Sequence, residues 1–279
     1  MRGIGWHRAA LAGSLLVGIM FLGIIADLVW QSLGVLSWHF LWSPPSEMGR
    51  GGIGPEVRNT LVMVGAASLI SLPLGLAGAV FRVEYSGAPL FVKVFDRVRF
   101  TFLSLPTIVV GLLVYQWVIV GLGWPLSIRS GIVALVVMNW PFVVNVGIEA
   151  LEGVPDTCRE GSLALGATRS QTLRRIVFPT ALPALVAGLG AATARLLGES
   201  AALIFTAGMN VAVHWSWGMP GETLAVHLWY LRTESLAPYA NAEAAGTGVV
   251  LLAVVALVLY LTQKIAHWLK PRDYSRKSA

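Results

Sequence analysis

Long apolar runs constrain this chain more than any other feature of its sequence. The first covers about residues 9–30, after three basic or titratable side chains, and is too long for the apolar part of a secretory signal, so we interpret it as a retained membrane span. Only 12% of the 279 residues are charged, against about 25% in soluble domains. The sequence therefore predicts an all-α integral membrane protein without a separate soluble domain. Six transmembrane helices are expected, at about residues 9–30, 59–81, 100–121, 130–150, 181–206 and 243–267.

Basic side chains are distributed unevenly between the two sides that these spans define. Fifteen of the twenty lysines and arginines fall on the side of the termini, four of them in a short connection at 82–99, and four fall on the other side. Loops rich in Lys and Arg stay in the cytoplasm, so both termini are expected there. The net charge of +6 then reflects topology, and the expected surroundings are membrane lipid rather than nucleic acid.

The stretch between the fourth and fifth spans is too polar to cross a bilayer. Thr157 and Glu160 have capping-box spacing, which predicts a short helix that begins at Thr157 and ends at Gly166. A second box at Thr168 opens a helix over 169–178, which Pro179 should interrupt. We expect a compact helix-turn-helix with exposed arginines, a shape suited to a groove on another protein.

The spacing within this stretch resembles the EAA loop of ATP-binding-cassette import permeases. That loop has Glu-Ala-Ala, three residues, Gly, nine residues, Ile, one residue and Leu-Pro. The matching positions are Glu160, Gly166, Ile176 and Pro179; Gly161 and Ser162 replace the alanines, and Phe178 replaces the leucine. The resemblance implies that loop 157–179 docks on a separate ATPase. The coupling residues that it implies are Glu160, Gly161, Gly166, Ala167, Thr168, Arg169, Ile176 and Pro179.

Arg195 and Glu199 are charged residues within the fifth apolar run. Their spacing of four predicts that they share one face of a continuous helix. Each charge costs about 2.5–3.5 kcal/mol at the bilayer centre, and this cost indicates that the pair has a functional or structural role. One hypothesis is a guanidinium that binds an oxyanion through paired hydrogen bonds, and the other is an ion pair that fastens this helix to a partner.

The same region extends the resemblance to PstA-type permeases of phosphate importers, over about residues 50–268. Residues 191–203, AATARLLGESAAL, resemble that family's ALARALGETAPL: Arg195, Gly198 and Glu199 match, while Ser200 replaces threonine and Ala202 replaces proline. The resemblance implies a MetI-like type I importer core and a substrate pathway of Arg195, Glu199 and Ser200. It also implies a PstC-like second permease, two PstB-like ATPases that hold ATP-Mg, and a PstS-like extracytoplasmic phosphate-binding protein. Permeases for molybdate, tungstate or sulfate share parts of these motifs, and a passive channel is a third alternative.

The remaining sequence features support a non-catalytic subunit. The glycines at 49–54 lack the Lys-Ser/Thr of a phosphate-binding loop, so no cofactor is expected on this chain and the segment is interpreted as flexible. His214 and His227 are too isolated to predict a metal site, and one cysteine, Cys158, excludes an internal disulfide. Asn139 is expected to form a hydrogen bond between helices. The expected organisation is an N-terminal helix and extracytoplasmic loop at 1–54, a permease core at 55–268 and a basic cytoplasmic tail at 269–279, in a bacterial inner membrane.

Overall fold

Every regular element in the described part of the chain is helical, as the sequence predicts. The computed structural model describes residues 3–46, 51–85, 87, 89–210 and 214–270. The long helices are α1 (Gly3–Ser32), α3 (Gly54–Val80), α6 (Ile128–Glu152), α9 (Phe178–Leu197) and α12 (Ala240–Leu269). The shorter ones are α2 (Trp38–Trp42), α4 (Pro89–Ser104), α5 (Thr107–Val114), α7 (Asp156–Ala164), α8 (Arg169–Thr172), α10 (Ala201–Ile204) and α11 (Leu224–Thr233). Wider π-helical turns occupy Phe81–Tyr85, Tyr115–Gly121 and Leu173–Val177.

Five helical segments in the described ranges are long and apolar enough to cross a membrane. They are Leu11–Ser32, Gly54–Tyr85, Ile128–Glu152, Arg169–Leu197 and Ala240–Leu269. A sixth candidate consists of Pro89–Ser104 and Thr107–Gly121, which meet at an angle of 105°. The predicted count of six therefore holds only if this bent pair crosses as one broken span.

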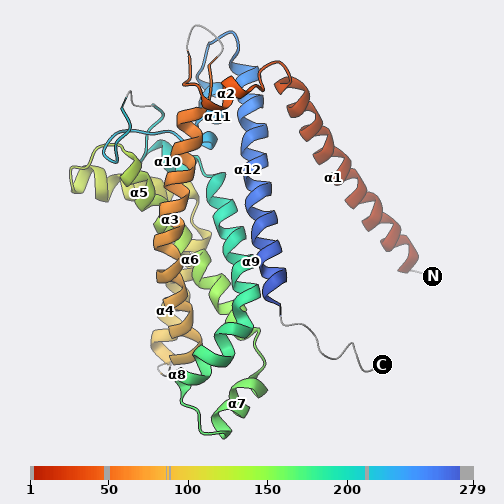
Figure 1. Cartoon of the computed structure of the whole chain (residues 1–279), viewed down its shortest axis with the longest axis vertical. Helices are drawn as coiled ribbons and strands as arrows, with labels where there is room; N and C mark the ends of the chain where they lie inside the picture. The colour runs from red at the N-terminus through yellow and green to blue at the C-terminus, as the bar shows by residue number, and fades with distance from the viewer. Residues whose placement is uncertain (1–2, 47–50, 86, 88, 211–213, 271–279) are drawn as a thin grey trace.

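Helices α3, α6, α9 and α12 form the bundle, and α1 contacts it through α12. In Figure 1, α1 leans away from the other helices, and its apolar window has no buried residue. Small residues let the central helices approach closely: a Cβ on Gly75 of α3 would lie 2.5 Å from Cγ1 of Val143 on α6. The α7–α8 region lies at the end of the bundle opposite α2 and α11 (Figure 1).

The third predicted span is wrong as a single straight helix, and its preceding connection is not a loop. Residues 89–104 form α4, and the chain turns at Leu105 and Pro106 before α5. Pro106 has no N–H to continue the α4 ladder, and it precedes the first residue of α5. Three of the four basic residues of the connection lie on α4, and Arg82 lies in the π-helical turn before it. Arg99 donates to Asn145 of α6, and Arg82 pairs with Asp96 of α4 at 3.0 Å. The segment predicted as a polar connection is therefore largely an amphipathic helix.

The fifth span also differs from its predicted limits of 181–206. It starts at Arg169 and passes through the π-helical turn Leu173–Val177 into α9, and Pro179 is the second residue of α9, directly after this wider turn. The prediction that Pro179 interrupts the helix is wrong. The α9 helix ends at Leu197, and residues 198–200 separate it from α10.

Candidate functional site

The loop after α6 forms two short helices, as predicted, although the first begins differently. Helix α7 starts at Asp156 after Pro155 and has no side-chain cap, so the capping box predicted at Thr157 is wrong. The second capping box is confirmed: Thr168 accepts from the backbone N–H of Gln171 at 3.3 Å, and the Gln171 side chain accepts from the Thr168 N–H at 2.8 Å. Gly166 joins the two helices with φ of +83°, which is the left-handed conformation predicted for it.

The predicted coupling residues lie on the outer surface of this loop. Glu160, Gly161, Gly166, Thr168, Arg169 and Pro179 are exposed, while Ala167 and Ile176 are half-buried. The hydroxyl groups of Ser162 and Thr172 lie 3.0 Å apart and tie α7 to α8. Arg159 is not one of the freely exposed arginines that we expected. It donates to the carbonyls of Leu151 and Val154, both at 2.6 Å, and pairs with Glu84 at 3.3 Å, so it anchors the loop to the bundle.

The sequence analysis missed Leu165, which is 91% exposed beside Gly166. It lines a hollow of about 520 Å³ together with Cys158, Gly161, Ala167 and Ile176, among others. An exposed leucine beside a hollow offers a knob and a recess to another surface. The motif could not reveal it, because its spacing fixes no residue type at position 165.

Arg195 lies in the last turn of α9 and is held by an aromatic ring of α6. Its guanidinium carbon is 3.9 Å from the ring centroid of Phe142. The Nη1 atom is buried and has no hydrogen-bond partner in the described part of the chain. A guanidinium that stacks on a ring keeps its N–H groups in the plane, where they can bind two oxygens of one anion.

Glu199 does not share a helical face with Arg195, so that prediction is wrong. The Glu199 carboxylate accepts the backbone N–H of Ala202 at 3.1 Å, and this bond competes with continuation of α9. The residue is buried, and in the described structure no ion pair joins it to Arg195. Ser200 is half-buried in the same break, where its carbonyl accepts from Leu203 and Ile204. Interrupted backbone within a membrane bundle is tolerated where protein or a cavity surrounds it, which is typical of transport pathways.

Asn139 forms the interhelical hydrogen bond that we expected. Its amide Nδ2 donates to Oγ of Ser71 on α3 at 2.7 Å, and the residue is completely buried. A second link joins α3 to α9, where the hydroxyls of Ser68 and Thr193 lie 3.4 Å apart. The structure therefore gives Asn139 a role in helix packing.

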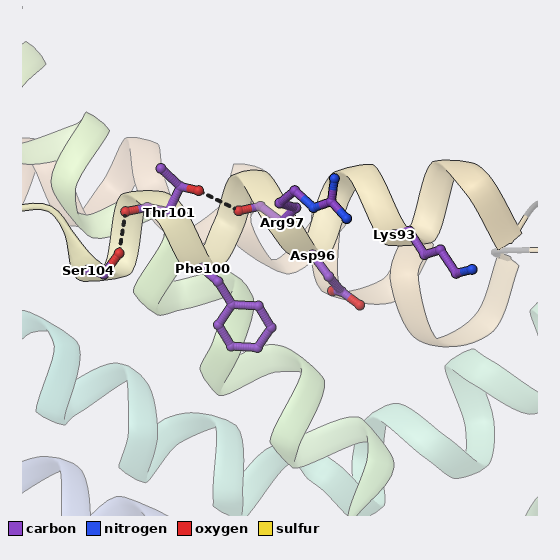
Figure 2. A pocket seen from close by; sticks show the side chains of 6 residues that line it. All are labelled: Lys93, Asp96, Arg97, Phe100, Thr101 and Ser104. Carbon is purple, nitrogen blue, oxygen red and sulfur yellow. Dashed lines mark hydrogen bonds between the residues drawn. The ribbon is translucent and has the colours of Figure 1, made fainter.

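A shallow hollow of about 520 Å³ lies along α4, away from the Arg195 site. Figure 2 shows its lining side chains along one helix, including Lys93, Asp96, Arg97 and Phe100. The hydroxyl groups of Thr101 and Ser104 are already used, since they donate to backbone carbonyls of α4 at 2.8 and 2.9 Å. Because one face of a single helix supplies these lining residues, the hollow has no opposing wall and is poorly suited to enclose a ligand.

His227 is not isolated in the structure, contrary to the prediction. Its Nδ1 lies 2.6 Å from Oε1 of Glu222, and Glu56 of α3 lies beside this pair. Glu56 lies far from the other two residues in the sequence, and Glu222 and His227, five residues apart, match no metal-binding motif, so their spacing does not predict the cluster.

The helical bundle, its broken helices and its exposed loop define an integral membrane protein of the transport permease class. Residues 55–272 match the model of the "Binding-protein-dependent transport system inner membrane component" family, and the chain belongs to this family. It is therefore a non-catalytic, multi-pass inner-membrane subunit of an ATP-binding-cassette importer, which works with an ATPase and a binding protein.

Several known proteins are similar to the chain over most of its length. The probable ABC transporter permease YqgI of Bacillus subtilis is 32% identical, over 95% of this chain and 93% of that protein. The phosphate transport system permease PstA of Haemophilus influenzae is 27% identical, over 91% and 93%. PstA 1 of Mycobacterium tuberculosis H37Rv is 33% identical, over 70% of this chain and 64% of that protein.

Solved structures support the fold. A chain of the MetNI methionine ABC transporter in an inward-facing conformation aligns with a TM-score of 0.63 and 23% identity, over 77% of this chain and 95% of that chain. A chain of a bacterial alginate ABC transporter aligns with a TM-score of 0.63 and 14% identity, over 92% and 93%. The predicted MetI-like permease core is confirmed by these similarities.

Proposed function

We propose that this chain forms half of the pore of an importer for inorganic phosphate. The observation that carries the proposal is Arg195, whose guanidinium is stacked on Phe142 and whose buried Nη1 has no hydrogen-bond partner among the described residues. An unpaired buried donor is costly, and an oxyanion would satisfy it. The similarity to PstA proteins of two bacteria supports phosphate as the anion.

Glu199 and Ser200 complete the proposed substrate pathway. The carboxylate of Glu199 uses one oxygen for the Ala202 N–H, and a carboxylate can accept several hydrogen bonds. Glu199 can therefore accept a hydrogen bond from a protonated oxygen of phosphate, a donor that fully ionised sulfate lacks. Ser200 adds a hydroxyl in the same break of the helix.

The loop at 157–179 is proposed to transmit ATPase movement to the pore. Its exposed face lies at the end of the bundle toward which the last residues of α12 point (Figure 1), and the basic residues favour the cytoplasm for that end. The proposed complex contains a PstC-like permease, two PstB-like ATPases that bind ATP-Mg, and an extracytoplasmic PstS-like protein. This chain itself is proposed to bind no cofactor.

Uptake by the reconstituted complex tests the proposal. Proteoliposomes that contain both permeases, the ATPases and the binding protein should transport labelled phosphate toward the ATPase side of the membrane when ATP is supplied on that side. The Arg195→Gln variant should lose uptake while all subunits still copurify. Faster accumulation of sulfate or molybdate would identify the alternative oxyanion permease, and ATP-independent flux would identify a channel. Loss of subunit association in Arg195→Gln would assign Arg195 to assembly instead.

A further inference from the structure

A buried cluster of two carboxylates and an imidazole lies at the end of the bundle opposite α7. Glu56 belongs to the first turn of α3, Glu222 precedes α11, and His227 belongs to α11. One ligand atom from each residue lies within 4.8 Å of the other two. The exposed fractions are 0% for Glu56 and 3% for both Glu222 and His227, so water cannot solvate the charges fully.

Most oxygens of this cluster have no partner among the residues that the structure describes. There, neither carboxylate oxygen of Glu56 has a hydrogen-bond partner, and Oε2 of Glu222 has none. Only Oε1 of Glu222 is engaged, by Nδ1 of His227 at 2.6 Å. A buried carboxylate without compensation is strongly unfavourable, so these three oxygens favour the binding of a positively charged species.

Backbone contacts hold the three side chains in place. The Asn59 amide donates to the Glu222 carbonyl at 3.2 Å, which joins α3 to the segment before α11. Thr60 strengthens this junction, because its hydroxyl accepts from the Leu224 N–H at 2.8 Å while donating to the Glu56 carbonyl at 2.7 Å. The cluster therefore rests on a fixed framework, which is what a ligand site requires.

We propose that Glu56, Glu222 and His227 bind a divalent transition-metal cation, Zn²⁺ or Mn²⁺, which fastens the start of α3 to α11. A mixed set of carboxylate and imidazole donors suits these ions, whereas Mg²⁺ and Ca²⁺ prefer oxygen ligands alone. A cleft of about 720 Å³ reaches Glu222 and His227 and gives the ion an entry path. Glu243, which is buried, also lines this cleft and adds a negative charge that favours cations.

A proton is the competing species at this cluster. Burial lowers the pKa of His227, but its hydrogen bond to the Glu222 carboxylate and the charges of Glu222, Glu56 and Glu243 together raise that pKa above its ordinary value. A metal ion would have to displace protons from the cluster, so its binding releases protons. A proton on Glu56 would neutralise that side chain but would leave acceptor capacity unused.

Metal binding by the purified full-length chain, without a polyhistidine tag, tests this proposal. After treatment with a chelator, Zn²⁺ and Mn²⁺ are titrated by calorimetry, and the thermal unfolding midpoint is recorded with and without each ion. We expect one ion per chain and a higher unfolding midpoint in its presence. Glu56→Gln and Glu222→Gln keep the side-chain size and should weaken binding by more than about tenfold, since even the loss of an outer-sphere partner commonly costs 10- to 100-fold.

Glu234→Gln is the matched control, because Glu234 lines the same cleft but is exposed and lies outside the cluster. It should bind the ion like the unchanged chain. Glu56→Gln in the metal-free state should be at least as stable as the unchanged chain, because it removes a buried charge; this separates ligand loss from misfolding. X-ray absorption at the zinc edge should show nitrogen and oxygen ligands that include imidazole. Absence of stoichiometric binding, or equal affinity in Glu56→Gln and the unchanged chain, would overturn the proposal.

Discussion

The guanidinium of Arg195 lies over the ring of Phe142, with 3.9 Å between its central carbon and the ring centroid. The contact joins the last turn of α9 to α6, so the packing of two bundle helices decides where the proposed anion donor points. A movement of either helix can therefore change the position of the Arg195 guanidinium at the proposed anion site. The importance of Arg195 therefore depends on a neighbour that carries no charge.

Replacement of Phe142 should weaken transport without removing any charge. A cation–π contact is worth about 0.5–2 kcal/mol, which corresponds to a factor of about 2 to 30. We expect Phe142→Leu to lower the maximal rate of phosphate uptake within that range, measured in proteoliposomes with saturating binding protein. Phe142→Tyr keeps an aromatic face and is the control. Equal rates for the Leu and Tyr variants would show that the ring does not position Arg195.

Glu199→Gln should change the choice between anions more than the fold. The amide oxygen of glutamine can still accept the Ala202 N–H, so the start of α10 is retained. The lost carboxylate can no longer favour a protonated anion, and penalties for unpaired buried groups of about 1–3 kcal/mol correspond to about 5- to 150-fold. The preference for labelled phosphate over sulfate, measured by equilibrium binding to the complex without binding protein, should narrow accordingly. An unchanged ratio with unchanged phosphate affinity would remove Glu199 from the selectivity site.

Features that depend on long stretches of sequence could be predicted, because many residues contribute to each one. The spans at α3, α6 and α12 follow from their apolar runs, and Gly166 follows from its place in a fixed motif. The bend before Pro106 and the break after Leu197 could not be predicted from hydropathy. At the second position α9 ends with Gly198 as its C-cap, and the Glu199 carboxylate accepts the Ala202 N–H, although most of the surrounding sequence remains apolar.

Features that depend on tertiary packing left no local trace in the sequence. In the sequence, Phe142 is an ordinary apolar residue, and its contact with Arg195 arises only because α9 packs against α6. Similarly, Gly51 belongs to a segment interpreted as flexible, yet its N–H donates to Glu243 of α12 at 2.7 Å. The cluster of Glu56 with His227 has the same origin. Residues 47–50 of that glycine-containing segment lie outside the described residues.

Gly111→Ala should disturb the contact between α5 and α10. A Cβ at this position would lie 2.6 Å from Cα and 2.9 Å from the carbonyl oxygen of Ala202, and backbone atoms cannot move aside without shifting α10. Overpacking typically costs about 1–3 kcal/mol, so we expect a lower unfolding temperature and reduced uptake. Gly65→Ala is the control, because no atom lies within 4 Å of its Cβ position. Identical thermal unfolding and uptake in the two variants would contradict the close packing of α5 on α10.

Cys158 provides a test of the proposed orientation. Its thiol is exposed on α7, and it is the chain's single cysteine. A membrane-impermeant maleimide should label it in inside-out vesicles and leave it unlabelled in intact spheroplasts, measured by a gel shift. Expression without the ATPase ensures that docking does not cover the thiol. Labelling from outside the spheroplasts would invert the topology and remove the loop from the ATPase.

Leu165→Asp should impair ATPase docking without destabilising the permease. The side chain is 91% exposed, so an acidic replacement loses little packing within the chain but places a charge on the proposed contact surface. Gly166→Val acts differently: its Cβ position meets no atom within 4 Å, but φ of +83° strains a β-branched residue, at a cost of about 1–3 kcal/mol. Copurification of the ATPase and ATP-driven uptake should fall in both variants. The unfolding temperature should fall only in Gly166→Val.

Leu236→Asp is the control for the surface change, because Leu236 is fully exposed in the segment between α11 and α12, at the opposite end of the bundle. The same substitution there should leave ATPase copurification unchanged, since no ATPase contact is proposed at that end. If Leu165→Asp recruited the ATPase as well as Leu236→Asp does, the knob beside Gly166 would not be part of the docking surface. The defect of Gly166→Val would then have to come from backbone strain alone.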